Sequence, residues 1–210
     1  MKAAPQEEID RLDALACCRI IGTPPEPEFD ALARLAALLT DSPLAWLTLV
    51  DAERVWVKAA YGRVPGGDYP RTGSPCELTL RERGLFEIPE LERQLGDHAL
   101  VAGTRAYAAV PLVVGKSVLG TLAVVARSPR SLNDVQREHL ITLGRQASAL
   151  LELRRLREPR QLKREELRYS ATRISGIGCW QWDLQSGEVL LSDEMLTLFG
   201  VEPSRTFGYE

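Results

Sequence analysis

Gly115, Lys116 and Ser117 are the first residues whose types and spacing suggest chemistry, because a phosphate-binding P-loop ends in this way. A P-loop also has a glycine five positions before this ending, and it leads directly into a helix whose N-terminus holds the anion. The earlier position is occupied by Val110, and apolar, largely β-branched residues come after Ser117. The stretch therefore predicts the tight turn of a β-hairpin between two apolar strands, and not a nucleotide site.

The four cysteines are the next candidates for metal binding or redox chemistry. They are Cys17, Cys18, Cys76 and Cys179, and no pair has the spacing of a metal site or of a redox motif. We therefore expect no metal site, and reduced thiols as in most cytosolic proteins. If its pKa were low, Cys76 could react with an oxidant or hold a cofactor. A small, buried apolar residue is the simpler interpretation of the same cysteine.

The two histidines carry weaker signals. His139 lies in "QREHLITLGR", without the acid and the proline that follow a phospho-acceptor histidine, so we interpret it as a solvated helix residue. His98 lies in the loop "GDHALVAG", where it could stand at the rim of a pocket or simply on the surface.

The composition is that of an ordinary globular protein. Of the 210 residues, 45% are apolar and 26% are charged, and the formal net charge is −3. The basic residues are scattered among acids, which argues against a nucleic-acid partner. The N-terminus lacks the apolar core of a signal peptide, and two strands explain the almost uncharged stretch 106–126 better than a membrane span does. We expect a cytoplasmic protein that does not enter the membrane.

Hydrophobic periodicity predicts an α+β fold in which helices flank an antiparallel sheet. The expected helices are 6–20, 29 to about 39 and 133 to about 157, and the expected strands are 44–51, 54–62, 85–90 and the two of the hairpin. Alternation along the second strand predicts one side formed by Val55, Val57, Ala59 and Tyr61. Asn133 and Gln136 have the spacing of a capping box, which predicts the start of the last helix.

Six stretches carry a more specific signal than periodicity does. They are "RLDALACCRIIGTPPEPEFDALARLAALL", "LTLVDAERVWVKAAYG", "SPCELTL", "DHALVAG", "YAAVPL" and "LGTLAVVARSPRSLNDVQREHLITLGRQASALLELR". In this order they resemble a bacterial GAF domain over residues 7–155, of the kind that precedes PAS modules, histidine kinases and diguanylate cyclases. The chain departs from the usual pattern at Gly22, where the family has aspartate, and at Pro75, where it has phenylalanine. The stretch from Pro89 to Tyr107 is also shorter than in the family.

The resemblance implies a pocket for a small-molecule ligand, and it leaves the ligand and any cofactor unknown. By their positions, the residues that we expect to line this pocket are Trp56, Cys76, His98, Arg105 and Tyr107. For Trp56 and Tyr107, a place in the hydrophobic core is an equally open alternative.

A second resemblance begins near Leu167. The stretch "LRYSATRISGIGCWQWDLQSGEVLLSDEMLTLFGVEP" resembles the opening of a PAS domain, with a lead-in helix, two strands and a short helix. We therefore divide the chain into a GAF-like domain with its long C-terminal helix (1–157), a helical linker (158–168) and a truncated PAS-like module (169–210).

The long helix after Asn133 is the element most informative about function. An apolar stripe runs along it, formed by Leu140, Leu143, Ala147, Leu150 and Leu151 and continued by Leu153 and Leu156. Apolar positions so late in the helix predict a homodimer through residues 134–157. Pro159 is expected to interrupt the helix, which would restart beyond it.

Together these features predict the N-terminal sensory region of a bacterial signalling protein, with no catalytic domain in this chain. A ligand or partner would change the packing of the sheet, and a dimeric helix would pass the change to a histidine kinase or diguanylate cyclase output. Two alternatives stay open: a small redox enzyme of the sulfoxide-reductase kind that uses Cys76, and a ligand-free dimerisation scaffold.

Overall fold

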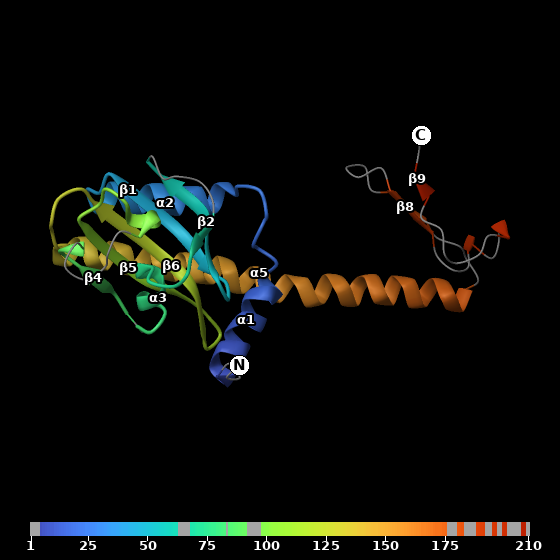
Figure 1. Cartoon of the computed structure of the whole chain (residues 1–210). Helices are drawn as coiled ribbons and strands as arrows, with labels where there is room; N and C mark the ends of the chain where they lie inside the picture. Colours follow the sequence, from blue (N-terminus) through green and yellow to red (C-terminus); the bar gives the residue numbers. More distant parts are fainter. Residues whose placement is uncertain are drawn as a thin grey trace. The chain divides into compact units, whose positions relative to one another are not determined.

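The computed structural model describes residues 5–62, 68–82, 84–91, 98–175, 180–182, 188–191, 195–196, 199–200 and 207–208 (Figure 1). The chain divides into two compact units, residues 1–156 and residues 157–210. Nothing in the described part of the chain is a helix long and apolar enough to cross a membrane.

The first unit is built on a six-stranded sheet in the order β3-β2-β1-β6-β5-β4, in which every neighbouring pair is antiparallel. The strands are β1 (Leu44–Val50), β2 (Arg54–Tyr61), β3 (Asp68–Pro70), β4 (Phe86–Ile88), β5 (Ala106–Val114) and β6 (Ser117–Ala126). The predicted antiparallel sheet is confirmed. So is the hairpin: β5 and β6 meet at a turn in which Gly115 has φ 61°, a conformation that glycine adopts without strain.

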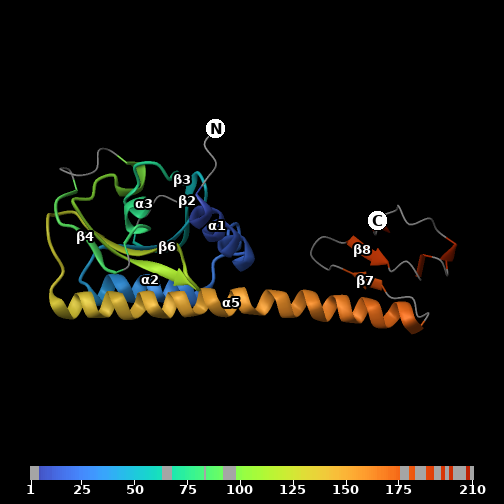
Figure 2. The same ribbon diagram turned by 90° about the horizontal axis from the view of Figure 1, so that it is seen from below.

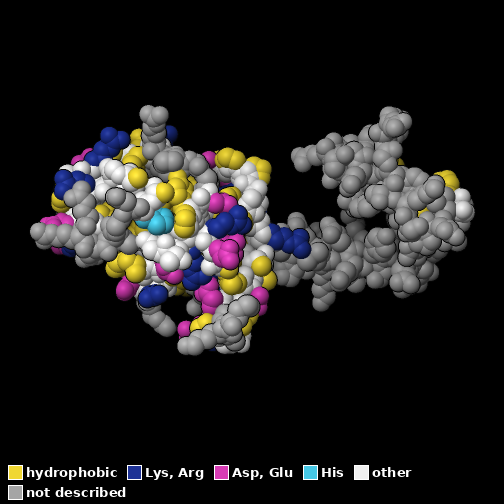
Figure 3. Space-filling view, viewed as in Figure 1, with side chains coloured by type: hydrophobic (Ala, Val, Ile, Leu, Met, Phe, Trp, Pro, Cys, Tyr) yellow, Lys and Arg dark blue, Asp and Glu magenta, His cyan; other side chains and the backbone are white. Residues whose placement is uncertain are grey.

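Three helices cover one face of the sheet: α1 (Gln6–Cys18), α2 (Pro27–Leu39) and α5 (Asp134–Ser175). The short helix α3 (Pro75–Thr79) and the 3-10 turn η1 (Ala99–Val101) lie over the opposite face. Figure 2 shows α2 and α5 on one side of the strands and α3 on the other. We call these sides the helix face and the α3 face. On the surface in view in Figure 3, positive and negative side chains are interspersed over the first unit.

The central strand β1 is buried along its whole length, so its side chains serve both faces. Leu47 and Leu49 pack on the helix face, whereas Trp46 and Val50 pack on the α3 face. This division follows from the alternation of side chains along a strand.

The register of β2 corrects the predicted alternation. Thr48 pairs with Val57 and Leu47 with Ala59, so a β-bulge leaves Lys58 without a partner on β1. As a result, Val55 and Val57 face α3 as a pair, while Ala59 and Tyr61 pack against the helix face. The predicted single side is wrong because a bulge shifts the period of two by one residue.

The start of α5 confirms the predicted capping box. The Asn133 side chain accepts from the Gln136 amide at 2.9 Å, and the Gln136 side chain accepts from the Asn133 amide at 3.1 Å. The first part of the predicted stripe is buried in the core of the same unit, where Leu140, Ala147 and Leu151 are fully buried. Its predicted continuation is wrong, because Leu153 and Leu156 are exposed on another side of the helix.

The expected interruption of α5 at Pro159 is wrong. The helix runs from Asp134 to Ser175, through the proline, for 42 residues. A proline inside a helix removes one backbone hydrogen bond and costs about 3 kcal/mol. The flanking residues are mainly Leu, Arg, Glu, Gln and Lys, which favour helix, and their summed preference offsets this local cost.

In the second unit, two strands form where the second resemblance implies them. They are β7 (Trp180–Trp182) and β8 (Glu188–Leu191), which pair with each other, and β8 also pairs with β9 (Phe207–Gly208); both pairings are antiparallel. Residues 183–187, between these two strands, and Cys179 lie outside the described residues.

Candidate functional site

A group of hydroxyls and one thiol lies buried in the middle of the α3 face. We call it the hydroxyl–thiol cluster; its members are Thr48 on β1, Cys76 and Thr79 on α3, Tyr107 on β5 and Thr121 on β6. Four of them are inaccessible to solvent, and Tyr107 is 2% exposed. The cluster therefore joins four elements of the fold inside a dry interior.

The hydrogen bonds of the cluster form a connected path. The hydroxyls of Thr48 and Thr121 are 2.9 Å apart, and Cys76 Sγ lies 3.5 Å from the first and 3.6 Å from the second. The Tyr107 hydroxyl lies 4.0 Å from the same sulfur and 3.2 Å from Thr79 Oγ1. Each buried polar atom thus has a partner, as burial requires.

Local sequence explains how the members meet. Thr48 and Thr121 are direct partners in the β1–β6 ladder, so they share one face. Ser74 caps α3 by accepting from the Glu77 amide at 3.1 Å, and Pro75 occupies the first turn, where its missing N–H costs nothing. These residues start α3 where Cys76 reaches the sheet.

The cluster is electrically neutral. Burial raises the pKa of the Cys76 thiol and raises that of the Tyr107 hydroxyl well above its ordinary value. Both groups therefore keep their protons at neutral pH. A thiol of this kind is a poor nucleophile and a poor metal ligand. Among the described residues, no group of three or more His, Cys, Asp or Glu side chains could hold a metal ion.

Trp46 adds an unused donor to the same face. It lies two residues before Thr48 on β1, packs in the α3-side core and is 1% exposed. Its indole Nε1 is buried without a hydrogen-bond partner. Such a group costs free energy until it finds an acceptor.

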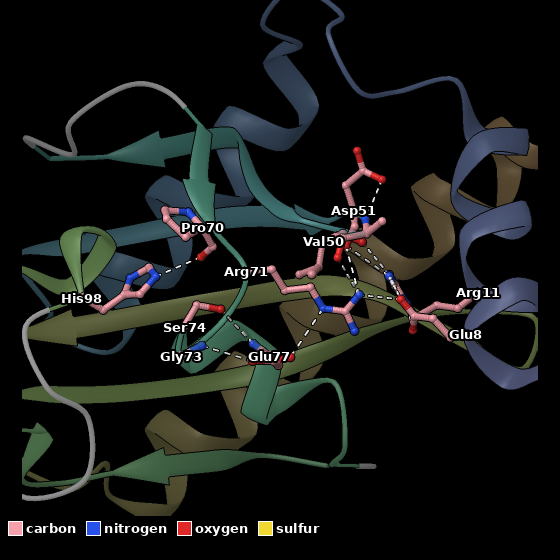
Figure 4. Close-up of polar contacts among 11 residues, drawn as sticks. Glu8, Arg11, Val50, Asp51, Pro70, Arg71, Gly73, Ser74, Glu77 and His98 are labelled. Atoms are coloured by element: carbon pink, nitrogen blue, oxygen red, sulfur yellow. Dashed lines mark hydrogen bonds and ion pairs between the residues drawn. The ribbon is translucent and has the colours of Figure 1, made fainter. Parts of the chain in front are cut away.

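His98 fastens η1 to the sheet at the rim of this face. Its Nδ1 accepts from the Leu100 amide at 3.2 Å, so Nε2 carries the proton and donates to the carbonyl oxygen of Pro70 at 2.9 Å (Figure 4). Leu100 and Val101 of η1 lie in the core next to α3. The histidine thus ties the end of β3 to the segment that leads into β5.

A cluster of charges joins α1 to the loop before α3 (Figure 4). Arg11 of α1 donates to both oxygens of the Glu8 carboxylate and to the carbonyl oxygen of Val50, and Arg71 donates to Glu8 Oε1, which it shares with Arg11. Arg71 also forms an ion pair with Glu77 of α3 at 3.7 Å. The hydrogen bond from Arg11, reinforced by Arg71, holds the pKa of Glu8 at about 2 against the opposing effect of burial.

The structure brings together two of the five residues that we expect to bind a ligand, Cys76 and Tyr107. His98 lies at the rim of the same face. Trp56 lies on the helix face, where the Lys58 ammonium is 5.6 Å from the centre of its ring. Arg105 is exposed just before β5, and its backbone amide donates to Ala126 at 2.7 Å.

Sequence reasoning missed the three threonines of the cluster. Thr48 and Thr121 each stand as a single hydroxyl within an otherwise apolar strand, in "LAWLTLV" and "LGTLAVV". An isolated hydroxyl within such a run is a usable signal, because a buried hydroxyl needs a partner. The identity of that partner depends on the pairing of β1 with β6.

Comparison with known proteins agrees with this fold. Residues 29–152, more than half of the chain, match the family model described as "GAF domain". The chain belongs to the GAF domain family. GAF domains are typical of sensory signalling proteins, and the predicted resemblance is confirmed for this part of the chain.

One curated relative and two solved structures give the context of this GAF domain. A cyclic di-GMP phosphodiesterase of Pseudomonas aeruginosa is 30% identical over 108 residues, which are 49% of this chain and 18% of that protein. The chain therefore matches less than a fifth of that relative's length. The GAF domain of a phosphoenolpyruvate-protein phosphotransferase from Acinetobacter has a TM-score of 0.53 at 17% identity, covering 70% of this chain and 94% of that one. A domain of a putative two-component sensor histidine kinase from Sinorhizobium meliloti has a TM-score of 0.50 at 19% identity, covering 63% and 94%. At these identities the two structures support the fold alone.

Proposed function

We propose that this chain is the sensory region of a bacterial, cytoplasmic signal-transduction protein. Its GAF domain (1–157) senses a small molecule or a partner, and α5 carries the change through residues 158–168 toward a PAS-like module (169–210). The output of the whole protein is a histidine kinase or an enzyme of cyclic di-GMP turnover, such as a diguanylate cyclase. The name of the relative from Pseudomonas aeruginosa supports the second class, and the resemblance to GAF domains that precede histidine kinases supports the first.

One observation carries the proposal: α5 is a core helix of the GAF domain, and the same helix leads out of that domain into the second unit. Leu140, Ala147 and Leu151 are buried against the sheet, and the helix continues to Ser175. Close packing extends this contact at Gly144, where an added Cβ would lie 2.4 Å from Val110 Cγ2 of β5. Because packed interiors transmit strain, a change in the sheet must move α5 or be opposed by it.

The ligand site of this proposal is the α3 face, with Cys76, Tyr107 and His98 from the predicted set. The hydroxyl–thiol cluster holds no charge, and Trp46 offers a free indole N–H. Such surroundings favour a small neutral molecule that carries a hydrogen-bond acceptor, because an anion would lose its hydration without gaining a counter-charge. α3 and η1 cover the cluster, so entry of a ligand requires them to shift.

The proposed homodimer uses the side of α5 that faces away from the sheet. Val135, Leu153 and Leu156 are 60%, 51% and 50% exposed, and the first two lie about five turns apart on one line of the helix. α2 runs antiparallel beside α5, since Gln136 bonds to Thr40 at one end and Arg154 to Glu26 at the other. α2 adds further exposed apolar side chains, Leu35, Leu38 and Leu39. Two copies packed through this surface would bury all six side chains.

Two experiments test the sensor. Thermal shift measurements with neutral amides, phenols and sulfoxides, and with cyclic nucleotides as anionic controls, should identify a neutral compound that raises the Tm by about 2 °C or more. The Thr121→Val variant should weaken that shift, and the compound should also alter amide exchange in α5. If no compound shifts the Tm, the ligand-free scaffold is the better explanation.

Light scattering tests the dimer. The chain should be dimeric at micromolar concentration, and Leu153→Glu with Leu156→Glu should make it monomeric. Ile9→Glu, at a position that is 41% exposed on α1, is the matched control and should stay dimeric. A monomeric wild-type chain would contradict the proposed interface.

The redox alternative rests on Cys76, and its surroundings argue against it. The thiol is fully buried with a raised pKa, and its hydrogen-bond partners are hydroxyls. Assay of methionine sulfoxide reduction by the wild type and by Cys76→Ser decides the point. Turnover that disappears in the variant would restore the enzyme hypothesis.

A further inference from the structure

Lys58 carries a charge into the core of the helix face. It lies at the β-bulge of β2, and its side chain has no solvent-accessible surface. Its Nζ donates to Thr23 Oγ1 and to the carbonyl oxygen of Pro24, each at 2.7 Å, and lies 2.7 Å from Glu26 Oε1. A buried ammonium needs such partners, because loss of its hydration is otherwise too costly.

Glu26 also contacts a second cation, which comes from α5. Arg154 of α5 places Nη1 2.9 Å and 2.8 Å from the two carboxylate oxygens of Glu26. The same guanidinium donates from Nε to the carbonyl oxygen of Cys18 at 2.8 Å, so it also fixes the end of α1. Burial opposes the charge of Glu26, but Lys58 and Arg154 prevail, and the pKa of the carboxyl is lowered.

These three residues form one bridge, which we call the Glu26 bridge: Lys58 on the sheet, Glu26 in the connection from α1 to α2, and Arg154 on α5. Among the described side chains, Arg154 is the furthest along α5 to hydrogen-bond with another element; the next residue, Arg155, bonds only to Glu152 of its own helix. The bridge therefore holds α5 at the point where it leaves the first unit, which ends at residue 156.

The bridge is also placed to respond to the sheet. Lys58 owes its position to the β-bulge of β2, which lies opposite Leu47 and Thr48 of β1. Thr48 is also a member of the hydroxyl–thiol cluster on the opposite face of the sheet. A shift of register at the bulge would move the ammonium, and the shared carboxylate would transmit the movement to Arg154. A carboxylate shared by two cations couples them, since each changes the free energy of binding of the other.

We infer that the Glu26 bridge is the coupling device that fastens the outgoing end of α5 to the sheet, and that its opening releases this end. The inference rests on the proposed function of α5 as the signalling helix. It adds the residues through which the sheet acts on that helix.

Hydrogen–deuterium exchange of the full chain tests the bridge, with Arg154→Gln compared against Arg155→Gln. Both variants remove one guanidinium at adjacent positions, but only the first opens the bridge. We expect amides 150–156 to exchange roughly tenfold faster in Arg154→Gln and within about twofold of the wild type in Arg155→Gln. Equal behaviour of the two variants would overturn the inference.

A double-mutant cycle tests the coupling to the sheet. Lys58 lies on β2, yet Lys58→Met should make amides 150–156 of α5 exchange several-fold faster. Adding Arg154→Gln to Lys58→Met should increase this exchange rate little further. If the increases in exchange rate caused by the two substitutions multiply, as for independent sites, the sheet does not act on α5 through Glu26 and the proposed coupling is refuted.

Amides of β1 report whether the fold survives in each variant. If the amides of β1 lose their protection from exchange in Lys58→Met, Glu26→Gln takes the place of Lys58→Met in the cycle. Glu26→Gln removes the negative charge that Lys58 and Arg154 share and keeps the shape of the side chain. The proposed function is tested separately, on the wild-type chain. It fails if no bound compound changes the amide exchange of α5, whatever the exchange rates of the variants are.

Discussion

The two faces of the sheet are both dry, but they are held together by different forces. On the helix face, large aliphatic side chains such as Leu47, Leu122 and Leu140 pack against one another, and the charges of the Glu26 bridge connect β2 to α5. On the α3 face, the polar groups lie at the centre, where Thr48, Thr121 and Cys76 meet. The helix face is stabilised mainly by close packing of apolar side chains, and the α3 face has in addition a network of hydrogen bonds at its centre.

This difference assigns the faces different roles. Close packing has no direction and a large total free energy, so the aliphatic core of the helix face should move as a unit. Hydrogen bonds are directional and exchange partners, so a ligand with one good acceptor could rearrange the α3 face at little cost. In the proposed function, the sensing face and the transmitting face are thus separated by a single layer of strands.

The largest effect should come from the helix face. Leu140→Ala removes a fully buried side chain and should lower the free energy of unfolding by about 2–5 kcal/mol. Leu153→Ala, on the same helix but 51% exposed, is the control and should cost less than about 0.5 kcal/mol in the monomeric state. Urea denaturation measures both values. Similar costs would mean that α5 is not part of the core.

The charge cluster at the junction of the two faces should come next. Because the folded pKa of Glu8 is lowered to about 2, its contribution is present above the ordinary pKa of about 4.5 and is lost as the pH falls toward 2. Glu8→Gln should cost about 1–2 kcal/mol at pH 7, after allowance for solvent screening, and should remove this part of the acid dependence.

The neighbouring Glu7 provides the matched control for this titration. It is exposed, so Glu7→Gln should leave both the stability and its dependence on pH nearly unchanged. An acid transition in Glu8→Gln that is indistinguishable from the wild type would refute the role of the cluster.

On the α3 face we expect an effect of similar size that is not additive. Thr48→Val should cost about 1–2 kcal/mol, because it leaves the Thr121 hydroxyl without its partner at 2.9 Å. Thr48→Val with Thr121→Val should cost less than the sum of the single variants, since both partners are then apolar. Simple additivity in urea denaturation would indicate that the two hydroxyls do not act as a pair.

The last prediction concerns the reactivity of the cysteine thiols and involves the smallest change in stability. Cys17 is exposed, whereas burial raises the pKa of Cys76 and raises that of Cys18 to about 11. Iodoacetamide at pH 8 should therefore alkylate Cys17 at least about a hundredfold faster than the other two in the folded chain. Mass spectrometry locates the label, and unfolding in urea should equalise the rates. Rapid labelling of Cys76 would favour the redox alternative.

Local features of the fold could be predicted where a few neighbouring residues decide the outcome. The capping box of Asn133 and Gln136 and the turn at Gly115 depend on contacts within a few positions, and both are confirmed. The apolar stripe of α5 is present from Leu140 to Leu151, but it is buried in its own domain. Leu153 and Leu156, predicted to continue it, lie on an exposed side of the helix, which carries the proposed dimer. Periodicity shows that a helix has an apolar side and not which partner covers it.

The sequence by itself determined the order of the main helices and strands, the antiparallel sheet and the resemblance to GAF domains, because short-range propensity and alternation encode them. It did not predict β3 or α3. Only the tertiary structure decided that Thr48 meets Thr121, that Trp56 faces the helices, and that Lys58 and Arg154 share Glu26. The physical reason is distance along the chain. Thr48 and Thr121 lie 73 positions apart, and Glu26 lies about 30 positions from Lys58 and 128 from Arg154. Strand register and one β-bulge bring these partners together.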